Sequence, residues 1–155
     1  MIKLVIILIS PFSFLFGQTN PILKTDTLSD LYKKSIISKD SLIYQSKFFH
    51  SFPATFRDFN DTYGYFDNQD PHLTYAGALY PDSYKHIELL FRLTNIPERE
   101  YYNKIINIAI GGHWEADAIN YFQNGLRNKV FENPRLTIDL LKIKSRRTGK
   151  RSGIN

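Results

Sequence analysis

Hydrophobic residues recur along most of this chain every three or four positions, which is the spacing of one face of an α-helix. Prolines divide the pattern into segments, because proline suits the first turn of a helix. The spacing of Pro81 and Pro97 indicates short antiparallel helical hairpins. The residues predicted to face the core from successive helices are Leu28, Leu31, Tyr32, Leu42, Ile43, Phe48, Phe49, Phe52, Phe56, Phe59, Tyr63, Tyr84, Ile87, Leu90, Phe91, Tyr101, Ile105, Ile108, Ala109, Trp114, Ala118, Ile119, Phe122, Leu136, Leu140 and Ile143.

Capping residues predict where these helices begin and end. Asp26 has a side chain suited to an N-cap, so the first helix is expected to start there. A later helix is expected to open at Pro53 and to close at Gly64 in a left-handed conformation. Gly125 is expected to stop or kink the helix that begins at His113. No long run of period-two alternation competes with this pattern, so we predict an all-α single domain of about six helices joined as antiparallel hairpins.

The first seventeen residues have the features of a secretory signal peptide. Lys3 supplies a positive charge, and the apolar run at residues 4–16 follows it. This run is shorter than the roughly 20 residues that a membrane-spanning helix needs. Gly17 is a small residue at a plausible cleavage point, and the chain beyond it is polar. We therefore expect a periplasmic or secreted protein with no transmembrane span after cleavage. An uncleaved anchor or a buried N-terminal strand is the alternative.

The distribution of charge marks a second boundary, near the C-terminus. Six of the 20 basic residues lie in the last fourteen positions, which hold no acidic residue, so the net charge of +5 belongs largely to this tail. A specific nucleic-acid binder is expected to carry a basic stripe on its folded body instead. A segment rich in Ser, Gly, Lys and Arg buries too little apolar surface to order itself. The predicted division is a signal peptide at 1–17, a polar linker at 18–25, a helical domain at 26–144 and a basic disordered tail at 145–155.

Composition excludes several classes of enzyme. The 155 residues are 43% hydrophobic and 15% aromatic, which is ample for the core of one domain. There is no cysteine, so a disulfide scaffold, a thiolate metal site and a thiol nucleophile are excluded. The sequence also lacks a Gly-x-Ser-x-Gly motif, a phosphate-binding glycine loop and a dinucleotide fingerprint. We therefore predict no cofactor and no metal, and we favour a role without catalysis.

One segment could nevertheless carry catalysis. Gly111 and Gly112 precede His113, Glu115 and Asp117. On a helix, His113 and Asp117 share a face, and this spacing can hold a divalent metal or pair a base with the group that orients it. Acidic residues in the first turn of a helix also complement its dipole, so a plain helix start is the favoured interpretation. An envelope hydrolase or metal-dependent enzyme centred on these residues is the alternative function.

A long irregular loop is expected at residues 64–80, and loops of this length in compact domains are commonly functional. It combines acidic and aromatic residues, which could bind calcium, a glycan or a protein, although the acids lack the spacing of an EF-hand. Tyrosine is enriched at protein interfaces, whereas the same rings could instead pack back onto the helices. The predicted partner-binding residues are Tyr63, Tyr65, Phe66, Asp67, Asp70, Tyr75 and Tyr80.

These observations together predict a small exported helical protein that docks onto another protein of the bacterial envelope. An inhibitor or an immunity-type protein would have this size, this address and this lack of catalytic motifs. His50 and His86 are isolated histidines on predicted helices, and such residues are usually structural, so neither is given a role.

Overall fold

The computed structural model describes residues 21–67, 69–112 and 117–151, and the predicted signal peptide at 1–17 lies outside them. Within these residues the chain is mostly helical, which confirms the all-α prediction. No helix in this part of the chain is long and apolar enough to cross a membrane. The elements are α1 (Pro21–Ile37), α2 (Ser41–Ser51), α3 (Phe56–Tyr63), β1 (Tyr65–Phe66), the 3₁₀ turn η1 (Pro71–Leu73), β2 (Tyr75–Ala76), the 3₁₀ turn η2 (Tyr80–Asp82), α4 (Ser83–Arg92), α5 (Glu98–Ala109), α6 (Asp117–Glu132) and α7 (Pro134–Arg151).

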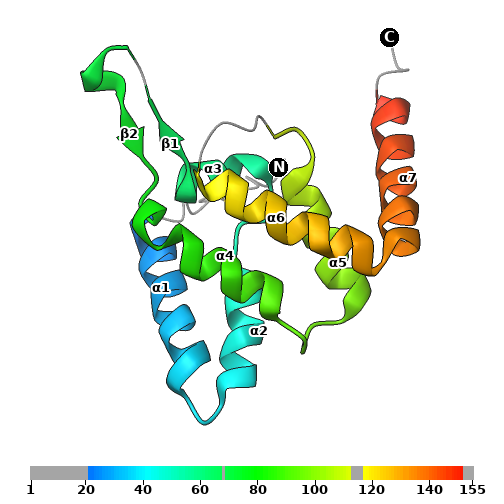
Figure 1. Ribbon diagram of the computed structural model, residues 1–155, viewed down its shortest axis with the longest axis horizontal. Helices are drawn as coiled ribbons and strands as arrows, with labels where there is room; N and C mark the ends of the chain where they lie inside the picture. Colours follow the sequence, from blue (N-terminus) through cyan, green and yellow to red (C-terminus); the bar gives the residue numbers. More distant parts are fainter. Residues whose placement is uncertain (1–20, 68, 113–116, 152–155) are drawn as a thin grey trace, which may run out of the picture.

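Some helices pair with their neighbours in the sequence and others with helices further along the chain (Figure 1). α1 lies beside α2, to which the turn at residues 38–40 connects it. α4 packs most extensively along α6, and α5 contacts both α3 and α7. The β1–β2 hairpin projects from one end of the body, and α7 stands at the other end (Figure 1). The body is therefore not a simple series of consecutive hairpins, because the main partner of α4 is α6 rather than α5.

Two helix starts differ from the sequence prediction. α1 begins at Pro21, so residues 21–25 are helical rather than a linker, and Asp26 lies inside the helix. α3 begins at Phe56 rather than near Pro53. Its N-cap is Thr55, whose Oγ1 accepts a hydrogen bond from the backbone N–H of Asp58 at 3.1 Å. A threonine hydroxyl satisfies a free N–H of the first turn, which proline cannot do, and this explains the later start.

The glycines also act differently from the prediction. Gly64 ends α3 with a φ of −70°, which is not left-handed, but a Cβ there would lie 2.3 Å from Oδ1 of Asn60. Among the described residues, the left-handed one is Gly111, with a φ of +82°, just after α5. Gly125 does not end a helix, because α6 continues through it to Glu132.

The C-terminal helix is longer than predicted. α7 extends to Arg151, so the backbone of residues 145–151 is helical, whereas the sequence predicted a disordered tail from residue 145. Lysine and arginine are good helix formers, and no proline interrupts the helix. Nζ of Lys144 donates to Oδ1 of Asn103 at 2.8 Å and to Oδ1 of Asn107, which ties the helix to α5.

The core contains a cluster of aromatic rings from α3, α4 and α6 and from the residue that follows α2. Phe52 follows α2 and stacks on Tyr63 of α3 with ring centroids 5.5 Å apart. The ring centroid of Phe59 in α3 lies 5.1 Å from that of Phe122 in α6, and the ring centroids of Phe122 and Phe91 in α4 are 5.3 Å apart. Such contacts add about 0.5–1.5 kcal/mol per pair to the burial of the rings. The cluster therefore holds α3, α4 and α6 together.

His86 of α4 lies inside this aromatic core and is 1% exposed. A hydrogen bond joins its Nδ1 to the Tyr63 hydroxyl at 3.0 Å, and the rings of Tyr32 and Phe48 lie 4.8 Å and 5.7 Å away. Burial lowers the pKa of His86 to about 4, and the nearby charge of Asp82 opposes this shift. Burial also raises the pKa of Tyr63. Both groups are therefore neutral at neutral pH, as a buried polar pair requires.

This burial predicts an acid-sensitive fold. Between pH 6.5 and pH 4 the unfolded chain binds a proton at His86 that the folded chain excludes, so the free energy of unfolding falls as the pH falls through this window. The loss is on the order of 3 kcal/mol and is complete below the lower pKa. Urea unfolding across this pH range measures it.

His86→Gln keeps a hydrogen-bonding side chain beside Tyr63 but cannot titrate, so this part of the pH dependence is expected to disappear. His72→Gln, at an exposed position on η1, is the control and keeps the wild-type profile. Equal pH profiles for His86→Gln and the wild type would contradict the assignment, whatever their stability at neutral pH.

Candidate functional site

The predicted irregular loop contains a short β-hairpin that is anchored firmly at its base. β1 pairs antiparallel with β2, with Tyr65 opposite Ala76 and Phe66 opposite Tyr75. At the base, the N–H of Gly77 donates to the carbonyl of Gly64 at 2.8 Å, and the N–H of Leu79 donates to the carbonyl of Thr62 at 2.9 Å. A Cβ at position 77 would lie 2.5 Å from the backbone of Thr62, so only glycine permits this approach. The hairpin is thus fixed to the end of α3.

Aromatic side chains occupy both faces of this hairpin. Phe66 and Tyr75 are directly opposite and stack with ring centroids 4.4 Å apart. Tyr65 points to the other face, because successive residues of a strand alternate, and its ring lies 5.4 Å from that of Tyr80. Tyr65 is 42% exposed and Tyr75 is 56% exposed. We call these four residues the aromatic hairpin.

Two of the predicted acidic residues lie at the end of the hairpin. Asp67 and Asp70 are exposed, and Oδ1 of Asp70 accepts a hydrogen bond from the N–H of His72 at 2.9 Å. In the described part of the chain, no three His, Cys, Asp or Glu side chains form a group that could hold a metal ion. Asp67 and Asp70 form a negatively charged rim beside the aromatic rings of the hairpin.

Tyr63 does not belong to this surface, and its prediction as a partner-binding residue is wrong. Its side chain is fully buried and its hydroxyl is bonded to His86. The helical periodicity, which predicted Tyr63 as a core residue, agrees with the structure, because Tyr63 is the last residue of α3 and faces the core.

A groove of about 390 Å³ lies between α4 and α6. Tyr84 of α4 and Tyr121 of α6 line it, and their rings meet edge to face at 5.2 Å. Glu88 and Arg92 line it as an exposed ion pair at 3.5 Å, so their charges balance. Sequence reasoning missed this groove and placed Tyr84 in the core, although the residue is 54% exposed. The groove exists only because two helices distant in sequence pack together.

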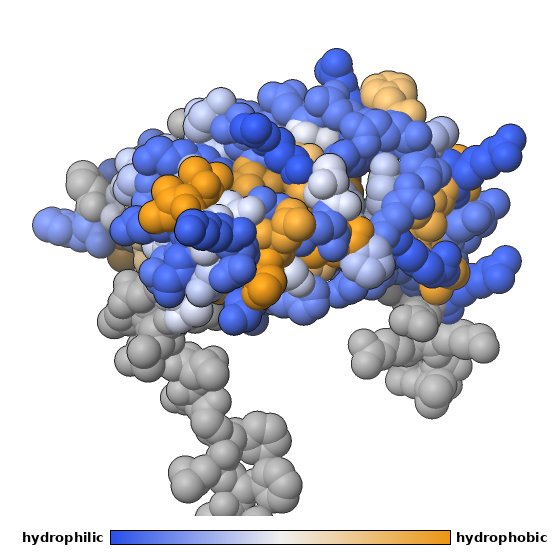
Figure 2. All heavy atoms as spheres, turned by 90° about the horizontal axis from the view of Figure 1, so that it is seen from below, coloured by the Kyte–Doolittle hydropathy of each residue, from blue (hydrophilic) through white to orange (hydrophobic). Residues whose placement is uncertain are grey.

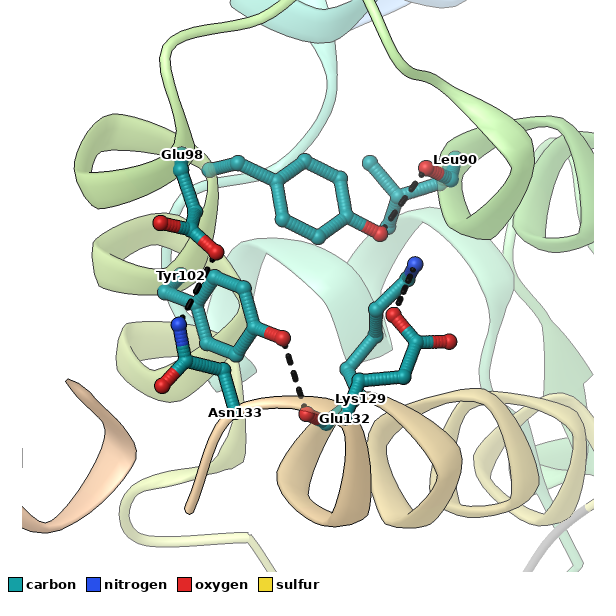
Figure 3. A network of polar contacts seen from close by, with 7 residues as sticks. Leu90, Glu98, Tyr102, Lys129, Glu132 and Asn133 are labelled. Carbon is teal, nitrogen blue, oxygen red and sulfur yellow. Dashed lines mark hydrogen bonds and ion pairs between the residues drawn. The ribbon is translucent and has the colours of Figure 1, made fainter. Parts of the chain in front are cut away.

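A polar network beside the groove joins α5 to both α4 and α6 (Figure 3). The Tyr101 hydroxyl donates to the carbonyl of Leu90 at 3.1 Å, and the Tyr102 hydroxyl donates to the carbonyl of Lys129 at 2.9 Å. Nζ of Lys129 contacts Glu132 at 2.7 Å. Burial raises the pKa of both tyrosines, so their hydroxyls stay protonated and donate. The network is structural, since its buried groups are bonded to one another.

The side chains of the enzymatic alternative lie outside the described structure. His113 and Glu115 lie outside the described residues, as does the side chain of Asp117, whose backbone begins α6. The alternative therefore stays a prediction. His50 is exposed on α2, with Nε2 3.5 Å from Glu100.

Comparison of the chain with models of protein families, with curated proteins and with solved structures finds no match.

The contact between α4 and α6 makes a prediction about Gly125. An added Cβ would lie 2.1 Å from the Phe91 ring, so Gly125→Ala is expected to destabilise the protein by about 1–3 kcal/mol through overpacking. At a helix position with free space the same change stabilises by up to about 1 kcal/mol. Urea unfolding therefore tests the contact between Gly125 and Phe91, because the sign of the change in the free energy of unfolding depends on it.

The matched test repeats Gly125→Ala in a Phe91→Ala background, where the clash is gone and the substitution is expected to be neutral or stabilising. A stabilising effect of Gly125→Ala alone would show that α4 and α6 do not pack in this way.

Proposed function

We propose that this chain is an exported protein-binding module that docks onto another protein of the envelope through the aromatic hairpin. The observation that carries the proposal is a hairpin that projects from the body (Figure 1). Its base is fixed, and one ring pair lies on each of its faces. Exposed aromatic rings on a projecting element are costly in water and are typical of interfaces.

The fixed base supports the proposal energetically. Binding costs conformational entropy wherever a loop must be ordered, and the hydrogen bonds at Gly77 and Leu79 order this hairpin in advance. Tyrosine also loses little side-chain freedom for the area that it buries. The acids Asp67 and Asp70 favour a partner with basic groups around an apolar centre.

The proposed export of the protein rests on its sequence. A positively charged start, a short apolar run and Gly17 support export, and a small exported binding module suits an inhibitor or immunity-type role. The enzymatic alternative on His113, Glu115 and Asp117 has no observation among the described residues in its favour.

Capture from envelope extract tests the hairpin. Tyr65→Ala/Tyr75→Ala is expected to lose a partner that the wild type retains, with affinity for the purified partner weakened at least about tenfold. The protein offers a matched control in Tyr84→Ala/Tyr121→Ala, because those tyrosines are 54% and 41% exposed and line the other candidate site.

The control is expected to retain the partner with wild-type affinity. Loss in the control and retention in the hairpin variant would move the site to the groove, and equal recovery of every partner by all three proteins would remove the hairpin from the proposal.

The signal peptide is tested separately. Protein expressed with its own N-terminus in a bacterial host and recovered from the periplasm is expected to have an intact mass that lacks residues 1–17. Leu8→Arg places a charge inside the apolar run. This variant is expected not to be exported, so the protein with residues 1–17 still attached stays in the cytoplasm. A periplasmic protein that retains residues 1–17 would contradict cleavage after Gly17.

A further inference from the structure

Exposed aliphatic side chains gather at the end of the molecule where α1 and α2 meet. Ile36 and Ile37 lie in the last turn of α1 and are 59% and 81% exposed. Leu42 and Ile43 lie in the first turn of α2 and are 60% and 57% exposed, although the sequence pattern predicted both in the core. We call these four residues the apolar tip. Figure 2, which views the molecule from this end, shows hydrophobic side chains at the surface among hydrophilic ones.

The tip lies at the end of a well-built helix pair, so its exposure is not a sign of a loose segment. Leu31 of α1 and Phe48 of α2 are buried between the helices and the body. Nδ2 of Asn95, in the turn after α4, donates to the carbonyl of Leu42 at 2.7 Å and fixes the start of α2. The four side chains are thus held outward by packed helices.

Lysines flank the tip on both helices and in the turn between them. Lys34 of α1 and Lys47 of α2 flank one ring, with their Nζ atoms 5.6 Å and 5.4 Å from the centroid of Tyr44. Lys34 lies two residues before Ile36 on α1, and Lys47 lies four residues after Ile43 on α2, so each lysine starts within about one helical turn of the aliphatic residues. Lys33 and Lys39 are exposed as well.

The charge of this end is positive overall. Asp30 pairs with Lys34 at 2.7 Å, and Asp40 lies in the turn. Four lysines against these two aspartates leave a net charge of +2. A neighbouring hollow of about 200 Å³ beside Ile36 adds Lys85 and Arg92, which pair with Asp82 and Glu88 and leave this balance unchanged.

We propose that the apolar tip docks into the surface of an anionic lipid bilayer. Segments that bind at the interface bury apolar side chains about 5–10 Å deep, and lysines behind them extend to the headgroup phosphates. The tip supplies both, with four exposed aliphatic side chains and lysines within about one helical turn of them. A second copy of the chain fits less well, because stable dimers bury about 800 Å² and 20–30 residues on each partner, far more than four side chains at a convex end provide. The proposal does not depend on the aromatic hairpin.

Cosedimentation with vesicles tests this proposal on the protein as it is recovered from an exporting host. The wild type is expected to bind vesicles of phosphatidylcholine that contain one third phosphatidylglycerol, to bind pure phosphatidylcholine weakly, and to dissociate as salt is raised. Ile37→Ser/Leu42→Ser is expected to weaken binding at least about tenfold. All proteins compared share the same N-terminus, so the difference between them reports the tip.

Two controls keep the result specific. Phe131→Ser removes a side chain that is 77% exposed on α6 and is expected to bind vesicles as the wild type does, as is Tyr65→Ala/Tyr75→Ala. Thermal melting checks that the tip variant is folded, which is the expected result for a change at exposed positions.

Equal vesicle binding by the wild type and the tip variant would overturn the proposal. So would a wild-type dimer in sedimentation velocity that Ile37→Ser/Leu42→Ser converts to a monomer, because a second copy would then cover the tip.

Discussion

The hydrogen bond between Tyr63 and His86 lies where the aromatic rings of the core meet, and it fixes the end of α3 onto α4. Separating the pair inside the core would leave two polar groups without partners, at a cost of about 1–3 kcal/mol for each. Tyr63 is the last residue of α3, and the chain turns into the hairpin immediately after it. The position of the hairpin base, at Gly64 and Gly77, therefore follows from a contact in the core. The exposed rings are held outward by the same constraint that buries the imidazole.

The two exposed surfaces lie far apart on the molecule. The aromatic hairpin projects from one end of the body, whereas the turn between α1 and α2 lies at another (Figure 1). Both carry large apolar side chains on rigid supports, but their surroundings differ in charge. Aspartates lie beside the hairpin, and lysines predominate around the apolar tip. A protein docked on a lipid surface by the tip would leave the hairpin free for a partner. The two proposals are thus compatible in geometry while each rests on its own residues.

Helix content could be predicted because it depends on local spacing, but the exact boundaries could not. Proline lies at or near the start of α1, α3, α4, α5 and α7, but not of α2 or α6. Capping decided the first residue, as Thr55 shows against Pro53. Gly125 looked like a helix end because glycine has a low helix propensity, yet its missing side chain is what allows Phe91 to pack against α6. That contact joins residues far apart in the chain, so no local pattern contains it.

The sequence by itself determined the helical class, the aromatic character of the segment between α3 and α4, and the apolar faces that meet in the core, because these follow from residue spacing and type. Tertiary packing decided which members of each face are buried. Tyr63 went inward because His86 offers its hydroxyl a partner, and Leu42 and Ile43 stayed outward because α2 begins beyond the edge of the body. Helical periodicity places a residue on a face, but only the contact with a second helix removes that face from water.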